Sequence, residues 1–113
     1  MPKKKNHPEV EPLLDELRNE YCSALPERFK RMEELLSKLK HTHNGEDLLE
    51  ELYTIVHRIS GTAGTFGLDK LGNIAGKWEE ELDALKGRKL ALHSEKFEAM
   101  SHHVTRMRKS ILF

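Results

Sequence analysis

The residue of this sequence whose type and setting best suit chemistry is His57. It lies in a stretch whose apolar residues recur every three or four positions, as on one face of a helix. That stripe consists of Leu48, Leu52, Ile55, Ile59 and Ala63. A helix advances about 100° per residue, which puts His57 on the side away from the stripe. We therefore predict an imidazole that projects into solvent, where neutral histidine can act as a nucleophile.

Two glycines follow the histidine on the same outward face. Gly61 stands at i+4 and Gly64 at i+7 from His57. Each glycine in a helix interior costs about 1 kcal/mol relative to alanine, and an exposed face gains no packing from it. We interpret this face as kept clear of side chains, so that a second protein can bring its backbone close to the imidazole. The alternative is that the glycines only fray or end the helix.

The elements that must position this histidine are helices, because apolar spacing is helical throughout and no strand alternation or repeat occurs. Pro26 lies close to the junction of the first two apolar stripes and predicts a helix start or a kink. We predict an all-α fold, an antiparallel four-helix bundle with a short additional N-terminal helix. The apolar stripes fall within residues 10–21, 25–39, 48–63, 68–85 and 97–111.

Turn signals separate these stripes. Residues 41–45 read as a loop with Asn44 as the N-cap of the next helix. Residues 64–67, Gly-Thr-Phe-Gly, predict a break, and residues 86–88 predict a helix end with a C-cap glycine. Because these connections are short, successive long helices should run antiparallel.

Composition narrows the class of protein. The chain has 113 residues, which fits one domain, and its 19 Lys and Arg balance 19 Asp and Glu. A nucleic-acid binder would show a basic excess, and no apolar run is long enough to span a membrane. The single cysteine, Cys22, fits a cytoplasmic location. We expect residues 1–8 to form a flexible basic tail and residues 9–113 to form the domain, in a free-standing monomer.

The stretch that begins at His57 resembles the motif of the histidine phosphotransfer (HPt) domain. In that family an apolar residue follows the histidine two positions on, a glycine four on and a second glycine ten on, before a helix with leucines. The matching residues are His57, Ile59, Gly61, Gly67, Leu68 and Leu71. The resemblance implies that His57 accepts a phosphoryl group from, or donates it to, receiver-domain aspartates of response regulators or of a hybrid sensor histidine kinase. It also implies no cofactor in this chain, with Mg²⁺ on the partner receiver domain.

One position departs from the family pattern. The family commonly has lysine three residues after the histidine, where this chain has Ser60. A serine hydroxyl donates a hydrogen bond but carries no positive charge. Arg58, Lys70 and Lys77 are therefore candidates for the charge that steadies the phosphoryl group, beside the supporting residues Ser60, Gly61, Gly64 and Gly67.

Residues around the histidine are candidates for docking a partner. Tyr53, Phe66 and Leu68 are the apolar candidates that flank it. Glu50 and Thr54 precede His57 on the same face, where they could orient the ring. Each of these side chains could equally serve as core or as solvated surface.

Other functions are open to test. The chain lacks the G-x-x-x-x-G-K-[ST] phosphate loop, so we expect no kinase activity of its own. A sensor-kinase dimerisation domain usually has proline five residues after its histidine, where this chain has Thr62. A helical adaptor that never carries phosphate is the main alternative. A metal site is disfavoured, because no two histidines have the i, i+4 spacing that puts both ligands on one helix face.

Overall fold

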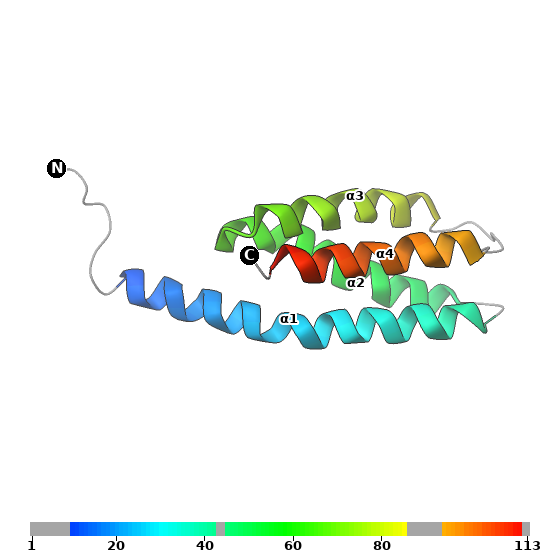
Figure 1. Ribbon diagram of the computed structural model, residues 1–113, viewed down its shortest axis with the longest axis horizontal. Coiled ribbons are helices and arrows are strands. Elements are labelled where there is room, and N and C mark those ends of the chain that lie inside the picture. The colour runs from blue at the N-terminus through cyan, green and yellow to red at the C-terminus, as the bar shows by residue number, and fades with distance from the viewer. Residues whose placement is uncertain (1–9, 43–44, 86–93, 112–113) are drawn as a thin grey trace.

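The computed structural model describes residues 10–42, 45–85 and 94–111, and within these ranges it contains helices and no strand (Figure 1). This confirms the all-α prediction. The elements in chain order are α1 (Val10–Lys40), α2 (Glu46–Thr62), the 3₁₀-helix η2 (Ala63–Phe66), α3 (Asp69–Leu85) and α4 (Ser94–Ser110).

The four α-helices form an antiparallel bundle in which each helix reverses the direction of the one before it (Figure 1). Helix α1 packs against α2 and α4, and helix α3 packs against the same two neighbours. One chain therefore completes the ring of four helices, as the short connections predict.

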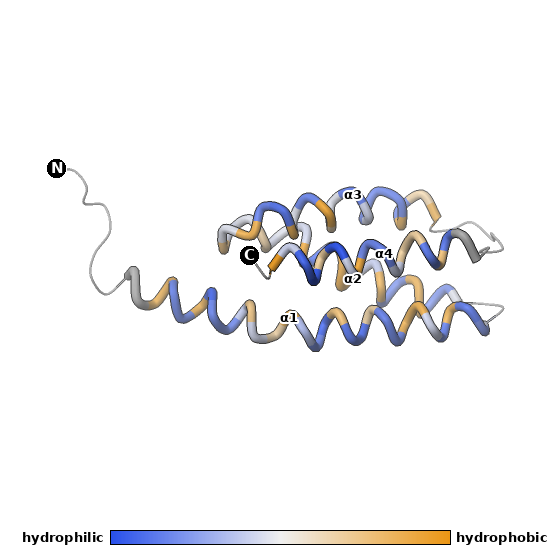
Figure 2. The backbone as a smooth tube through the Cα atoms, in the orientation of Figure 1, coloured by the Kyte–Doolittle hydropathy of each residue, from blue (hydrophilic) through white to orange (hydrophobic). Residues whose placement is uncertain are grey.

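The core lies along the bundle axis and is wholly apolar among the described residues. Along every helix, hydrophobic and hydrophilic residues alternate with the helical period that such a core requires (Figure 2). The buried residues are Leu25, Phe29, Met32, Leu35, Leu36, Leu39, Leu52, Val56, Ile59, Ala63, Leu71, Ala75, Trp78, Leu82, Phe97, Met100, Val104 and Met107. Val56 joins the predicted stripe of α2 as a fully buried member, whereas Ile55 is only partly buried.

The prediction of a short, separate N-terminal helix is wrong, because α1 is one helix of 31 residues that runs through Pro26. Proline inside a helix removes one backbone donor, and its ring crowds the carbonyl four residues before it. Its side chain faces solvent here, while Leu25 and Phe29 on the adjacent face are buried in the core. We infer that the packing of these flanking turns outweighs the local loss and keeps the helix continuous.

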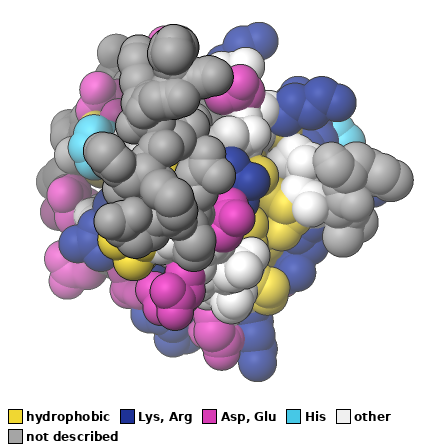
Figure 3. Space-filling model, turned by 90° about the vertical axis from the view of Figure 1, so that its left-hand side faces the viewer, with side chains coloured by type: hydrophobic (Ala, Val, Ile, Leu, Met, Phe, Trp, Pro, Cys, Tyr) yellow, Lys and Arg dark blue, Asp and Glu magenta, His cyan; other side chains and the backbone are white. Residues whose placement is uncertain are grey.

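Three leucines of the first apolar stripe, residues 10–21, are exposed and do not pack in the core. Leu13, Leu14 and Leu17 are 54%, 52% and 41% exposed. The reason is length: the other three helices have 17 residues each, so α1 is roughly 20 Å longer at 1.5 Å per residue. Its N-terminal end extends beyond the bundle (Figure 1), and charged side chains dominate the coloured surface of the molecule seen from that end (Figure 3).

The predicted break at residues 64–67 is confirmed as the turn that joins α2 to α3. Gly67 ends η2 with a φ of 78°, in the left-handed region that favours glycine. Its N–H donates to the Gly64 carbonyl at 3.0 Å, and the Leu68 N–H donates to the Ala63 carbonyl at 3.0 Å. At the other end of α2 the N-cap is Gly45. The predictions for Asn44 and for residues 1–8 and 86–88 lie outside the described residues.

Candidate functional site

His57 stands on the face of α2 that points away from the core. Its side chain is 60% exposed, whereas its neighbour Val56 is fully buried. The helical spacing of the α2 stripe therefore places the imidazole as predicted, at a fixed point on a helix held by the core.

A carboxylate on the neighbouring helix α3 holds one nitrogen of the ring. The Nδ1 atom of His57 lies 2.7 Å from Oε2 of Glu79, a residue whose side chain is 22% exposed. An ionised carboxylate can only accept hydrogen bonds, so the contact requires the proton on Nδ1. In the neutral ring, Nε2 on the opposite side then keeps its lone pair.

Hydrogen bonding keeps this carboxylate ionised. The hydrogen bond from His57 lowers the pKa of Glu79 below its ordinary value of 4.5. Hydrogen bonds from Ser60 and Tyr53 lower this pKa further, and partial burial opposes them. Glu79 therefore carries its negative charge near pH 7, beside the imidazole.

Sequence reasoning did not identify Glu79, because its pairing with His57 depends on the register between α2 and α3. In an antiparallel helix pair, residues equally distant from the turn lie opposite each other. His57 and Glu79 each stand 11 positions from residue 68. Ser60 and Gly76 each stand eight from it, and a Cβ built on Gly76 would lie 3.5 Å from the Ser60 Oγ. The pairing is therefore centred on residue 68, at the end of the turn, and not in the middle of the break predicted at residues 64–67.

The glycines beside the histidine leave open space. A Cβ at Gly61 would meet nothing within 4 Å, and one at Gly64 would meet only Oδ1 of Asp69, at 3.8 Å. Neither glycine has a positive φ. Packing and backbone conformation thus give no reason for glycine at these two positions, which agrees with a face kept clear of side chains.

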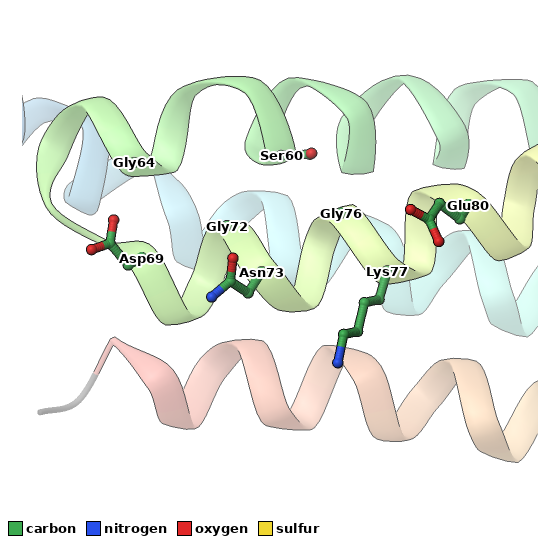
Figure 4. Close-up of a pocket in the computed structure, with 8 residues that line it drawn as sticks. All are labelled: Ser60, Gly64, Asp69, Gly72, Asn73, Gly76, Lys77 and Glu80. Carbon is green, nitrogen blue, oxygen red and sulfur yellow. The ribbon is translucent and has the colours of Figure 1, made fainter.

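Helix α3 contributes further glycines to this face, which sequence reasoning did not include. A shallow hollow of about 490 Å³ lies between α2 and α3 (Figure 4). Its lining residues are Ser60, Gly64, Asp69, Gly72, Asn73, Gly76, Lys77 and Glu80. Gly72 and Gly76 have no side chains to fill this hollow, and across it they face Ala63 and Ser60.

The three candidate cations differ in position. Lys77 lines the hollow, but its side chain extends away from Ser60 (Figure 4). Arg58 and Lys70 are exposed on α2 and α3. The Ser60 hydroxyl, at the position where the family commonly has lysine, helps to lower the pKa of the Glu79 carboxyl. A supporting role for each of these residues remains a prediction.

The candidates for partner docking are mostly half-buried. Phe66 stacks on Tyr21, with ring centroids 4.7 Å apart, and Leu68 packs against the core. Tyr53 stacks on the imidazole of His57 itself. Docking by these side chains remains a prediction.

The two polar docking candidates lie one helical turn apart on α2. Thr54 donates its hydroxyl to the carbonyl of Glu50 at 3.0 Å. The Glu50 side chain is exposed. The role of these two residues in orienting the ring remains a prediction.

A second His–Glu pair shows what distinguishes His57. His103 Nε2 lies 3.1 Å from Oε1 of Glu81, but the side chain is only 14% exposed and packs against Trp78. Exposure therefore separates the two histidines, since a partner can reach only the first.

Metal-binding clusters and membrane-spanning helices are both absent from the residues that the structure describes. No group of three or more His, Cys, Asp or Glu side chains there could hold a metal ion. None of the helices in those ranges is both long and apolar enough to cross a membrane.

Comparison with known proteins agrees with this geometry. The chain is 26% identical over 87 residues to the chemotaxis protein CheA of Rhizobium meliloti (strain 1021). That alignment covers 77% of this chain but 12% of the relative, so the chain spans a small part of that protein's length. No solved structure matches the chain. The family model for the Hpt domain matches residues 16–110. A match over most of the chain, together with an exposed histidine on a four-helix bundle, shows that the chain belongs to the Hpt domain family.

Proposed function

We propose that this chain is a phosphorelay intermediate that carries a phosphoryl group on Nε2 of His57. The observation that supports this most strongly is the arrangement of the ring: a 60% exposed imidazole whose Nδ1 is held at 2.7 Å by Glu79. The phosphoryl group is exchanged with the aspartate of a receiver domain, on a response regulator or a hybrid sensor histidine kinase. Its similarity to part of a chemotaxis protein is consistent with a place in two-component signalling.

The transfer step balances at the ring nitrogens. The lone pair of Nε2 forms the N–P bond while the P–O bond of the partner's aspartyl phosphate breaks, and the aspartate carboxylate leaves. The proton on Nδ1 stays in place, so the phosphorylated ring carries a positive charge. The ionised Glu79, next to Nδ1, neutralises that charge where it develops. The reverse step returns the group to an aspartate.

Phosphoryl transfer depends mainly on positioning and on neutralising charge. Helix α2 supplies a nitrogen at a fixed place, and the glycine face lets the partner's backbone approach it. The partner receiver domain holds the Mg²⁺ and the acidic pocket. In this proposal the chain draws no phosphate from ATP, contains no cofactor and acts as a monomer in the cytoplasm.

The test is phosphotransfer from a receiver domain that carries radiolabelled phosphate. Wild type should gain label that acid removes and base does not, as expected for phosphohistidine. His57→Gln should gain none. His102→Gln, which removes an exposed histidine on α4, is the matched control and should label like wild type.

Two other results of this assay would refute the proposal. Label that persists in His57→Gln would refute the assignment of the phosphorylated residue. A second result would also refute the proposal. If the wild-type chain binds receiver domains but takes up label from none of a panel of them, it is an adaptor that carries no phosphate.

A further inference from the structure

Tyr53 occupies an unusual position, one helical turn before His57 on α2. Residues at i and i+4 are neighbours on a helix surface. The ring of Tyr53 stacks on the imidazole with centroids 5.7 Å apart and planes only 9° from parallel. This separation is within the range of favourable offset stacking. The half-buried Tyr53 ring also packs against the core, so it gives the exposed imidazole a fixed surface to lie on.

The tyrosine hydroxyl reaches the same carboxylate that binds the imidazole. It donates to Oε2 of Glu79 at 3.4 Å, and Nδ1 of His57 lies 2.7 Å from that same oxygen. One carboxylate oxygen therefore receives two donors from α2. The stack limits the tilt of the imidazole, whereas the shared oxygen decides which ring nitrogen faces α3.

These contacts give Tyr53 a role directed into the site, rather than only towards a docking partner. Resting on the proposed function of His57, we propose that Tyr53 is a positioning residue for phosphoryl transfer. Its ring holds the imidazole so that Nε2 faces the phosphoryl donor, and its hydroxyl adds a long, weaker hydrogen bond to Glu79.

A small donor tests this role separately from docking. Phosphoramidate needs no protein surface: Nε2 forms the N–P bond while the P–N bond of the donor breaks and ammonia leaves. With Tyr53→Leu, which removes both stack and hydroxyl, we expect labelling of His57 to slow about threefold to tenfold. With Tyr53→Phe, which keeps the stack, the rate should stay within about twofold of wild type.

Nitrogen NMR of the ring supplies a readout that a purely structural role would not change. In the neutral imidazole of wild type, Nδ1 should appear protonated and Nε2 unprotonated. Tyr53→Leu should shift both signals towards their average, as the two neutral tautomers mix. The matched control is Tyr21→Leu, which removes the chain's other tyrosine from its stack on Phe66 and should leave these signals unchanged.

The outcomes separate this inference from the proposed function. If wild type is labelled but Tyr53→Leu keeps the wild-type labelling rate and ring signals, the positioning role of Tyr53 is wrong. The proposed function of His57 as the phosphorylated residue is then unaffected. If Tyr53→Phe is as slow as Tyr53→Leu, the stack is not what orients the ring, and the inference is overturned as stated. Should Tyr53→Leu fail to fold, Tyr53→Met, which keeps bulk without a ring, takes its place in both measurements. Wild type that takes no label from any donor overturns the proposed function itself.

Discussion

Gly61 offers a test in which stability and transfer should change in opposite directions. It lies in the last turn of α2, its φ is not positive, and a Cβ there would meet nothing within 4 Å. Replacing glycine by alanine in such a place removes a conformational cost of about 0.5–1 kcal/mol. Gly61→Ala should therefore raise the free energy of unfolding by about that amount and Tm by about 2–6 °C.

The longer side chain of Gly61→Gln tests the bare face directly. Glutamine also forms helix well, so the fold should again be stabilised by a few tenths of a kcal/mol or more relative to glycine. A side chain forced into a close-packed interface typically costs about 1–3 kcal/mol. Transfer from a phosphorylated receiver domain should then slow at least about fivefold.

The assay pairs thermal unfolding with two phosphoryl donors. Labelling by phosphoramidate needs no docked protein and should stay within about twofold of wild type. Ala99→Gln, at an exposed position on α4, is the matched control and should leave transfer unchanged. Gly61→Ala that loses stability would show that the fold requires the glycine. Normal receiver transfer by Gly61→Gln would refute the idea that a partner needs this face bare.

Two further predictions concern the turn and the carboxylate. Gly67→Ala places an L-residue at a φ of 78° and should lower the free energy of unfolding, measured by urea titration, by about 1–2 kcal/mol. Gly64→Ala is the control and should not lower the free energy of unfolding. Equal losses in the two variants would contradict the explanation by backbone strain at Gly67. Folding lowers the pKa of Glu79 below 4.5, mainly through the His57 hydrogen bond, so its stabilisation is complete above pH 4.5 and is lost as pH falls through the lowered pKa. As pH falls from 4.5 through the lowered pKa, urea titrations should show that wild type loses more free energy of unfolding than Glu79→Gln. If both proteins lose the same amount, the hydrogen bond between His57 and Glu79 does not contribute to stability.

Local periodicity was sufficient for most of the bundle. The stripes on α2, α3 and α4 follow the helical period, and burial of Leu52, Ile59 and Ala63 agrees with them. The turn at residues 64–67 was readable because only glycine adopts the left-handed conformation cheaply. The continuity of α1 could not be predicted from the sequence, because the helix propensity of proline is a local property. What keeps the helix continuous is the burial of Leu25 and Phe29 against the other helices, which is a tertiary property.

By itself, the sequence determined that His57 faces away from the core, because the face of a residue on a helix follows from its position relative to the apolar stripe. The tertiary structure decided what surrounds that ring. Glu79 reaches the imidazole and the Tyr53 hydroxyl because of how far α3 is offset along α2, a register set by the length of the turn and by side-chain packing. Helical periodicity specifies the face of each helix but leaves that offset open, so the orientation of the imidazole emerged only in three dimensions.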